Sequence, residues 1–457
     1  MFQSINPATD EILAEYPEMT AADTRRVLRL ATAAFTHWSR TDFAERSALL
    51  NSVAEHLRSD PDPLARLATL EMGKTITEAR AEITKCAWVC EHYGSHAEAF
   101  LADETVDLGD GRRARIAHRP LGPLLAIMPW NFPFWQVFRA AVPALMAGNV
   151  VVLKHAANVT GCALAIEALF RRCGFPEGVF SVLRLPGSAM RRIIRSRSIA
   201  AVTLTGSTEA GRKVASAAGA ALKKTVLELG GSDPYLVLED ADLDLAARTC
   251  ARARMINAGQ SCIAAKRFIV VESIRKAFEQ RLVAEMERYT TGDPLLESTR
   301  LAPLARRDLR AELHRQVRAS LDAGARLLLG GNPPPDDTPG AFYPATVLTD
   351  VRPGMPAFDE ETFGPVAAII AARNEKEAIR LANRTTFGLG SAVFTRDLER
   401  GTRIARDELL SGGSAVNTFV QSDPRLPFGG IRDSGYGREL GPIGIREFVN
   451  TKTILLG

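Results

Sequence analysis

Apolar residues between about positions 20 and 100 recur every three or four residues, as one face of a helix requires. Val27, Leu28, Ala31 and Ala34 form one such series, and a second series begins at Leu49. This spacing predicts that the chain opens with a helical segment.

From residue 121 onward the pattern changes to short apolar runs separated by helical stretches. A first group of runs ends near residue 240, and a second alternating region extends from about 241 to 414. Strands that alternate with helices favour a parallel sheet, so the chain is predicted to contain two α/β units. The predicted strands are residues 124–128, 150–153, 179–182, 201–205 and 225–229 in the first unit, and 268–271 and 367–371 in the second.

Two further segments have strand character. Residues 106–116 alternate around an Asp110-Gly111 turn, which predicts a β-hairpin that could protrude. Residues 449–456 form a terminal strand with little local company. We expect this tail to pair with another element or with another subunit.

The composition is that of an ordinary soluble globular protein, with 46% hydrophobic and 24% charged residues. A length of 457 residues favours two or three domains. The formal charge of only +4 is scattered, which argues against a nucleic-acid partner. The N-terminus lacks a secretory signal, and the apolar runs are far shorter than the ~20 residues of a spanning helix. We therefore expect a cytoplasmic protein without a membrane partner.

Cysteine usage favours a lone thiol over a disulfide framework. The six cysteines are irregularly spaced and form no CxxC pair, so neither disulfides nor a zinc ribbon is indicated. Cys86 and Cys90 stand close to His92 and His96, but on a continuous helix the histidines point about 100–120° away from the cysteines. We interpret this segment as a structural helix and predict no metal.

One cysteine stands in a setting suited to chemistry. Cys262 follows the stretch 257–261 (Asn-Ala-Gly-Gln-Ser), where small residues let the backbone bring a thiol close to a ligand. Glu228 ends a β-branched run and precedes Gly230 and Gly231, which sets a carboxylate at a strand end and makes it a candidate base. A single cysteine is more often a core residue. The prediction that Cys262 is a nucleophile therefore depends on the other motifs found in the chain.

Two further motifs suit ligand binding. Asn131 lies between Pro129 and Pro133, which fix the chain, so its amide is a candidate oxyanion donor. The run 202–205 passes through Gly206 and Ser207 into a helix, whose free N–H groups can face a pyrophosphate. This turn lacks the three spaced glycines of the usual dinucleotide fingerprint, so on its own it is equally compatible with a purely structural role.

These motifs together, in this order, resemble the aldehyde dehydrogenase superfamily. Similar segments elsewhere make the likeness run nearly end to end: 5–9, 151–154, 360–365, 427–430 and 434–439. The resemblance implies an α/β, aldehyde dehydrogenase-like fold with a Rossmann-type cofactor domain, an α/β catalytic domain and a small β oligomerisation element. The implied ranges are 1–101 with 121–230 for NAD(P) binding, 231–447 for catalysis, and 102–120 with 448–457 for assembly into a homodimer or homotetramer.

The resemblance also implies a mechanism. Cys262 attacks the aldehyde carbon, and the Asn131 amide with the Cys262 backbone N–H stabilises the oxyanion. Hydride leaves to NAD or NADP, and Glu228 activates the water that hydrolyses the thioester. Relatives that acylate coenzyme A lack this glutamate, so its presence implies a free acid as the product. Ala264 stands where some members carry a second cysteine, so no disulfide regulation is predicted.

Cofactor contacts follow from the same resemblance. Lys154 and Glu361 are placed on ribose hydroxyls, Ser207 near the pyrophosphate and Phe363 against the nicotinamide. Ala157 stands where NAD-restricted relatives carry a glutamate that would repel a 2′-phosphate, so both NAD and NADP are permitted. Without the resemblance, the charged residues would be interpreted as surface groups and Phe363 as a core aromatic. The full predicted set is Trp130, Lys154, Ala157, Gly206, Ser207, Glu361 and Phe363.

The substrate prediction depends on an arginine. Trp135 and Arg139 follow Asn131 at intervals of four, so a helix from Pro133 would align the three on one face. An arginine there can clamp a carboxylate, which favours succinate semialdehyde. The competing interpretation of Arg139 is a surface ion pair.

The family resemblance supports the clamp, because succinate-semialdehyde dehydrogenases carry arginine at this place. A second arginine that some members have six positions before the nucleophile is Ile256 here, so selectivity is looser or relies on Gln421 or Ser422. Two other functions stay open: oxidation of another short aldehyde, such as glutarate semialdehyde or lactaldehyde, and a non-catalytic binding role. Loss of the nucleophile, the base or the amide would have signalled the latter, and all are present.

Overall fold

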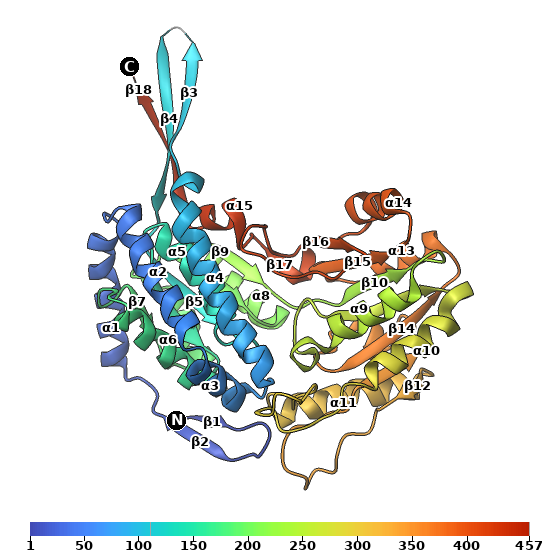
Figure 1. Cartoon of the computed structure of the whole chain (residues 1–457). Coiled ribbons are helices and arrows are strands. Elements are labelled where there is room, and N and C mark those ends of the chain that lie inside the picture. The colour runs from blue at the N-terminus through green and yellow to red at the C-terminus, as the bar shows by residue number, and fades with distance from the viewer. Residues whose placement is uncertain (110, 457) are drawn as a thin grey trace.

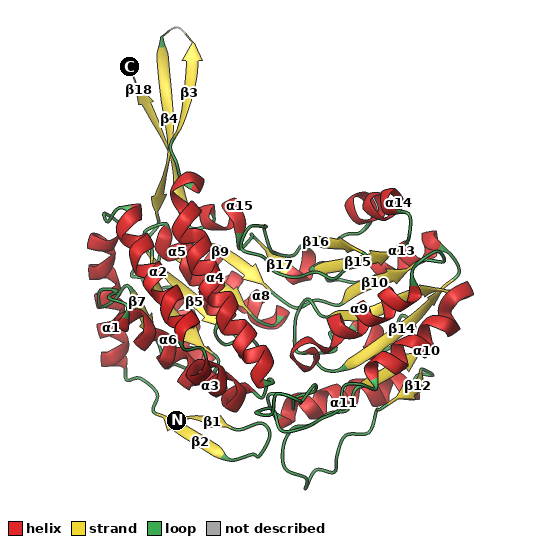
Figure 2. Ribbon diagram, in the orientation of Figure 1, coloured by secondary structure: helices red, strands yellow, loops and turns green. Residues whose placement is uncertain are grey.

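The computed structural model describes residues 1–109 and 111–456, so Gly457 and Asp110 of the expected hairpin turn lie outside the described residues. The chain forms two α/β bodies side by side, with a thin β arm above the N-terminal one (Figures 1 and 2). Within the described ranges, no helix combines the length and the apolar character needed to cross a membrane.

The opening segment is helical, as the apolar spacing predicts. Three of its four helices begin after a residue whose side chain caps free N–H groups, namely Thr20, Asp42 and Thr75. The last helix runs unbroken through the cysteine and histidine cluster, so the expectation of a structural helix is confirmed. A short hairpin that the sequence did not predict precedes them. The bounds are β1 Phe2–Ile5, β2 Ile12–Tyr16, α1 Ala21–Trp38, α2 Phe43–Ser59, α3 Asp62–Met72 and α4 Ile76–Phe100.

The first sheet has the strand order β17-β9-β8-β5-β6-β7, and β9 to β7 are parallel. The chain enters at β5, builds outward through β6 and β7, and returns to β8 on the other side of β5. The carboxyl ends of β5 and β8 therefore flank a topological switch point, where open α/β sheets bind ligands. The bounds are β5 Pro123–Met128, α5 Trp135–Met146, β6 Val150–His155, α6 Thr160–Arg172, β7 Phe180–Val182, α7 Met190–Ile194, β8 Ala201–Thr205, α8 Thr208–Gly219, β9 Lys224–Glu228 and β17 Gly435–Tyr436.

The second sheet has the order β12-β13-β14-β11-β10-β15-β16, in which only the edge pair β12 and β13 is antiparallel. Its buried residues form a hydrophobic core separate from that of the first body. Every strand predicted for the two units is present. The bounds are β10 Asp233–Val237, α9 Leu243–Met255, β11 Ala265–Val271, α10 Arg275–Met286, α11 Arg307–Asp322, β12 Arg326–Leu329, β13 Thr346–Thr349, α12 Pro356–Asp359, β14 Val366–Ala372, α13 Glu375–Asn383, β15 Gly390–Phe394, α14 Leu398–Arg403 and β16 Gly413–Val416.

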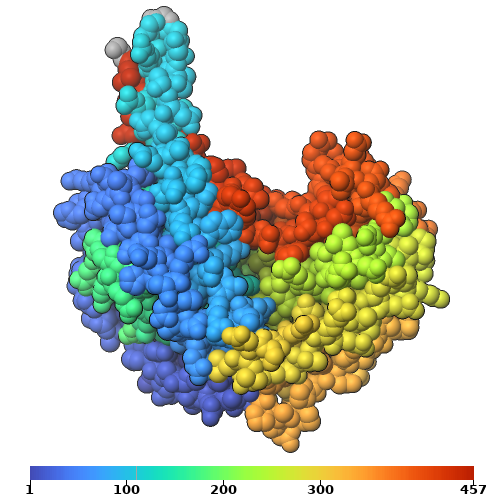
Figure 3. Space-filling model, viewed as in Figure 1, coloured from blue at the N-terminus to red at the C-terminus, as the bar shows by residue number. Residues whose placement is uncertain are grey.

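The arm contains the predicted hairpin and the tail. β3 (Glu104–Gly109) pairs with β4 (Arg112–Pro120), and after α15 (Gly441–Arg446) the chain returns as β18 (Val449–Leu456) along the other edge of β4. The tail therefore finds its partner within its own chain. Figure 3 shows the arm standing clear of the body, with both outer strands almost fully exposed.

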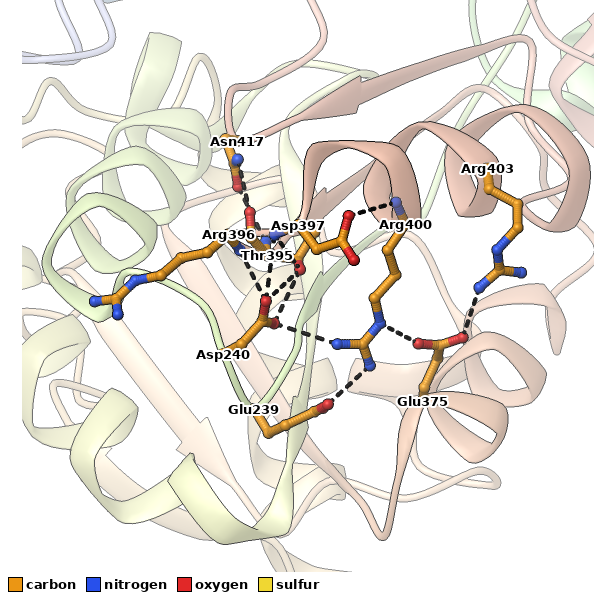
Figure 4. A network of polar contacts seen from close by, with 9 residues as sticks. All are labelled: Glu239, Asp240, Glu375, Thr395, Arg396, Asp397, Arg400, Arg403 and Asn417. Carbon is orange, nitrogen blue, oxygen red and sulfur yellow. Dashed lines mark hydrogen bonds and ion pairs between the residues drawn. The ribbon is translucent and has the colours of Figure 1, made fainter.

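The carboxyl edge of the second sheet is filled by a network of charges (Figure 4). Asp240 and Thr395 follow the neighbouring strands β10 and β15, and the Asp240 carboxylate accepts hydrogen bonds from the Thr395 hydroxyl at 2.8 and 2.9 Å. Arg400 of α14 donates to Glu375 at 2.5 Å and to Glu239 at 2.9 Å, and also pairs with Asp240. Since β10 and β15 flank the switch point of this sheet, the protein's own side chains occupy that crevice.

Candidate active site

A cavity of about 450 Å³ opens beside Cys262. Its walls come from α4 and α5 of the first body, from α9 of the second, and from the loop at 419–422. The structure thus brings the expected nucleophile together with every residue that the sequence assigned to substrate binding. Those residues are Trp135, Arg139, Gln421 and Ser422.

The loop before Cys262 has a strained backbone. Asn257 and Ala258 have φ values of 56° and 53°, and Gly259 follows with 74°, so three consecutive residues are left-handed. For residues with a Cβ this conformation costs on the order of 1–3 kcal/mol each, and it persists only where surrounding contacts enforce it. A Cβ at position 259 would collide with the Gly364 carbonyl group, so glycine is required there.

Side chains from both bodies enforce this conformation. Glu78 of α4 accepts the Asn257 N–H at 2.6 Å, and Arg254 of α9 donates to the Gly259 carbonyl. Lys266, buried at the start of β11, donates to the carbonyls of Ser261 at 3.0 Å and Cys262 at 2.7 Å. The sequence analysis missed these charged residues, because each acts on a segment that is brought near only by the fold.

Cys262 is the accessible thiol of the chain. It is half-buried, whereas the other five cysteines are buried. Burial raises the pKa of the Cys262 thiol to about 12, although the nearby charges of Arg139 and Lys266 oppose the rise. The thiol is therefore protonated at neutral pH in the free protein, and its reaction as a nucleophile requires a proton acceptor.

The Asn131 amide is held rigidly, as the flanking prolines predict. Its oxygen accepts from Gln136 Nε2 at 3.1 Å, and its Nδ2 donates to the Gln260 carbonyl at 3.0 Å. Since Nδ2 carries two hydrogens, one remains available beside the loop that ends at Cys262. The Cys262 N–H makes no hydrogen bond within the described residues. The two donors predicted for an oxyanion are therefore fixed and still free.

Glu228 ends β9, as the sequence predicts, and both oxygens of its carboxylate lack hydrogen-bond partners within residues 1–109 and 111–456. Burial raises its pKa well above the usual value, and the neighbouring Glu439 adds to the rise. Gly429 packs directly on this carboxylate, so a side chain at position 429 would fill the space. A buried carboxyl group with a raised pKa is suited to accept a proton from water.

Arg139 has a carboxylate partner of its own. Its guanidinium forms a buried ion pair with Glu439, donates to Thr205 Oγ1 at 3.1 Å and lies 4.8 Å from the Phe428 ring centroid. The competing interpretation of a surface pair is wrong, because both side chains are under 5% exposed. The prediction that Asn131, Trp135 and Arg139 share one helix face is correct only in part. Helix α5 begins at Trp135, so Asn131 lies in the preceding turn. Binding of a substrate carboxylate by Arg139 stays a prediction.

We expect Arg139→Met to lower the free energy of unfolding by about 3–5 kcal/mol, because it leaves the Glu439 carboxylate buried without its counter-charge. Chemical denaturation checks this value. The double variant Arg139→Met/Glu439→Gln should recover much of the loss. Equal stability of the single and double variants would contradict a coupled pair.

A second cavity, of about 970 Å³, lies at the carboxyl edge of the first sheet. Lys154 at the end of β6 and Ser207, the N-cap of α8, both line it. Lys154, Arg191 and Arg195 face the cavity without an ion-pair partner in the part of the chain that the structure describes. This crevice fits a dinucleotide: it is positively charged, and it holds the N-terminus of a 12-residue helix at the switch point.

The other predicted cofactor residues are not among the side chains that line these two cavities. Gly206 joins β8 to α8, and Ala157 is exposed at the start of a short 3-10 helix after β6. Phe363 packs edge-on against Trp130, with 5.7 Å between ring centroids. Glu361 accepts the Gly231 N–H at 3.0 Å and lies 3.5 Å from Lys266. Lys266 thus connects Glu361 to the loop that ends at Cys262.

The fold and these two sites define a class. A Rossmann-type sheet with a basic crevice, beside a half-exposed thiol and a fixed amide, is the arrangement of a dinucleotide-dependent oxidoreductase with a cysteine nucleophile. The model of the aldehyde dehydrogenase family matches residues 1–454. The chain belongs to the aldehyde dehydrogenase family, which confirms the resemblance seen in the sequence.

Individual relatives are similar over their whole length. A probable NADP(+) succinate-semialdehyde dehydrogenase of Synechocystis sp. is 49% identical over 451 residues, covering 99% of this chain and 98% of the relative. The succinate semialdehyde dehydrogenase Sad of Escherichia coli, an NAD(P)+ enzyme by name, is 48% identical, covering 99% and 97%. The solved structure of succinic semialdehyde dehydrogenase from Streptococcus pyogenes in complex with NADP+ has a TM-score of 0.96 at 36% identity, covering 99% of each chain.

Proposed function

We propose that this protein oxidises succinate semialdehyde to succinate with NAD or NADP as the electron acceptor. The observation that carries the proposal is the cavity at Cys262, which brings the thiol together with cationic and hydroxyl side chains, while the Asn131 amide is fixed beside the loop that ends at this cysteine. Such a cavity suits an aldehyde that carries a carboxylate. Names of the relatives support the same substrate and both cofactors.

The chain's own residues supply the covalent chemistry. As the Cys262 sulfur forms a bond to the aldehyde carbon, the thiol proton passes to the carboxylate of Glu228, whose charge acts on this thiol, and from there to solvent. The carbonyl oxygen becomes an oxyanion that the Asn131 amide and the Cys262 N–H stabilise. A bound nicotinamide would supply the hydride acceptor, and loss of the hydride would leave a thioester on Cys262. Glu228 then takes a proton from water as the water attacks, the carbon–sulfur bond breaks, and the acid is released.

The cofactor would be held by the crevice of the first sheet. Ser207 and the N-terminus of α8 would face the pyrophosphate, and Lys154 would bind a ribose hydroxyl. Gly206 leaves room for a close approach, since a Cβ there would meet only Leu204, at 3.8 Å or more. On the nicotinamide side, Phe363, Trp130 and Glu361 would orient the ring and its ribose.

The test is a panel of aldehydes with and without a terminal carboxylate, assayed with NAD+ and NADP+ by formation of the reduced cofactor. The proposal predicts the highest kcat/KM for succinate semialdehyde. A higher kcat/KM for glutarate semialdehyde or lactaldehyde would change the proposed substrate but leave the proposed mechanism standing. Absence of turnover with any aldehyde would support the non-catalytic alternative.

We expect Ala157→Glu to weaken NADP+ binding by about tenfold or more relative to NAD+, because a carboxylate there would repel the 2′-phosphate. The ratio of the two dissociation constants, from quenching of tryptophan fluorescence, checks it. Ala157→Gln is the matched neutral control. An unchanged ratio in the glutamate variant would remove position 157 from cofactor selection.

The arm supports a further proposal, that copies of the chain associate through it. Exposed apolar residues lie on both of its outer strands, and unpaired strand edges favour pairing with another chain. We propose the predicted ranges 102–120 and 448–457 as this element, with 1–101 and 121–230 binding the cofactor and 231–447 carrying the catalytic loop. Dimer and tetramer are equally compatible with it. The exposed apolar residues are Val106, Leu108, Ile454, Leu455 and Leu456.

A further inference from the structure

The positively charged side chains that line the cavity at Cys262 differ in whether they already have an ion-pair partner. Arg139, which the sequence analysis predicted to bind the substrate carboxylate, is neutralised by Glu439. Lys85, Arg252 and Arg300 also line the cavity, and none of them has a carboxylate within ion-pair distance among the described residues. The free positive charge therefore belongs to side chains other than Arg139.

The acidic residues of the cavity are already engaged. Glu82 pairs with the buried Lys74 and accepts the N–H groups of Phe134 and Trp135 at 2.8 Å each. Glu78 accepts the Asn257 N–H. Glu82 and Asp423 offset the charge of Lys85 only in part, because neither lies within ion-pair distance of it, so the cavity keeps an excess of positive charge that an anionic ligand would balance.

Lys85 is the most enclosed of the three free cations. It projects from α4, and its Nζ donates to Ser422 Oγ at 2.8 Å while lying 4.3 Å from the Trp135 ring centroid. Arg252 and Arg300 are exposed at the rim. Burial, together with the charge of Arg139, lowers the pKa of Lys85 to about 8, which shows that its ammonium is poorly compensated in the free protein.

An ammonium in this setting can still donate hydrogen bonds. Lys85 has three N–H groups, of which Ser422 uses one and the Trp135 face attracts the charge without consuming a donor. The Ser422 hydroxyl can in turn donate its own hydrogen to a second acceptor. Together they form a pair of donors in the cavity that also holds Cys262, and this pair matches the two oxygens of a carboxylate.

We propose that Lys85, with the Ser422 hydroxyl, binds the carboxylate of the substrate aldehyde and is the residue that selects it. Arg139 then stabilises Glu439 and the end of the cavity near Glu228, without direct contact to the substrate carboxylate. This inference rests on the proposed function, since it names the group that recognises the carboxylate of succinate semialdehyde.

The test compares succinate semialdehyde with butanal, which has the same four-carbon chain without the carboxylate. In Lys85→Met, the ratio of kcat/KM for succinate semialdehyde to that for butanal should fall about 10- to 100-fold, as expected for a lost hydrogen bond to a charged group. The loss should lie in KM rather than kcat. Lys85→Arg should recover most of the ratio, because it keeps the charge.

Lys276→Met, on the exposed surface of α10, is the matched control and should keep the wild-type ratio. Oxidation of butanal reports whether the Lys85 variant has folded with a working thiol, and Lys85→Gln serves if the methionine variant does not fold. The inhibition constant of succinate, a second carboxylate probe, should rise by a similar factor.

The outcomes separate this inference from the proposed function. A wild-type enzyme that does not favour succinate semialdehyde over butanal overturns both. A wild-type preference that survives in Lys85→Met and in Lys85→Gln overturns the role of Lys85 and leaves the proposed function standing. A drop in kcat with an unchanged KM would also overturn it, because carboxylate anchoring acts on binding.

Discussion

Replacing Cys262 by alanine is expected to abolish aldehyde oxidation, with a loss in kcat on the order of 10⁴-fold or more, as for removal of other covalent nucleophiles. In the proposed mechanism the sulfur holds the substrate through both steps, and no other cysteine of the described chain reaches the cavity. Formation of NADH or NADPH from succinate semialdehyde measures the loss.

Cys250→Ala is the matched control for this experiment. Cys250 is fully buried in α9 of the second body and lies outside the cavity, so the variant should keep its activity. Iodoacetamide offers an independent check, because it should alkylate Cys262 alone in the folded protein. Since the pKa of this thiol is raised to about 12, the rate of alkylation should increase with pH throughout the neutral range. Substantial turnover in Cys262→Ala would remove the thioester from the mechanism.

Glu228→Gln is expected to lower steady-state kcat about 10²- to 10⁴-fold while leaving the first turnover in place. The amide cannot accept a proton from water, so the thioester on Cys262 should accumulate. Rapid-quench measurement of the reduced cofactor should show one equivalent formed in a burst, and mass spectrometry of the intact protein should show the added acyl group.

The rate of thioester hydrolysis should also change with pH in a defined direction. Burial and the Glu439 charge raise the pKa of Glu228, so the fraction in the carboxylate form, and with it the rate of thioester hydrolysis, should increase as pH rises. The Gln variant should lose this dependence. Glu55→Gln, an exposed change on α2, is the control. A Glu228→Gln enzyme with undiminished turnover and no acyl adduct would assign the base elsewhere.

The sequence was sufficient for the architecture because the relevant forces are local. Apolar periodicity distinguishes helices from strands, and the alternation of the two predicts parallel sheets. The placement of Glu228 and Ser207 at strand ends follows from the same pattern, since each comes directly after an apolar run. The hairpin of β1 and β2 was not predicted because its strands are short and mostly exposed, so they lack a clear apolar alternation.

What the sequence could not predict depends on contacts between distant segments. Arg139 and Glu439 are 300 residues apart, so nothing near Arg139 indicates that its charge is already paired. Lys85 stands in a helix with ordinary polar spacing, and it becomes a site residue only when Ser422 is folded against it. The left-handed conformation at Asn257 and Ala258 is likewise imposed by Glu78, Arg254 and Lys266 rather than by local preference.

Each of the two sheets has a switch point, but the crevices there differ. In the first sheet the ends of β5 and β8 open onto a basic cavity, whereas in the second the ends of β10 and β15 are bridged by Asp240, Thr395 and Arg400. A nucleotide could enter the second crevice only by breaking these pairs. We therefore expect a binding stoichiometry of one dinucleotide for each chain, whatever the number of chains in the assembly. Titration with the cofactor can therefore measure directly the fraction of chains in which the crevice of the first sheet is intact.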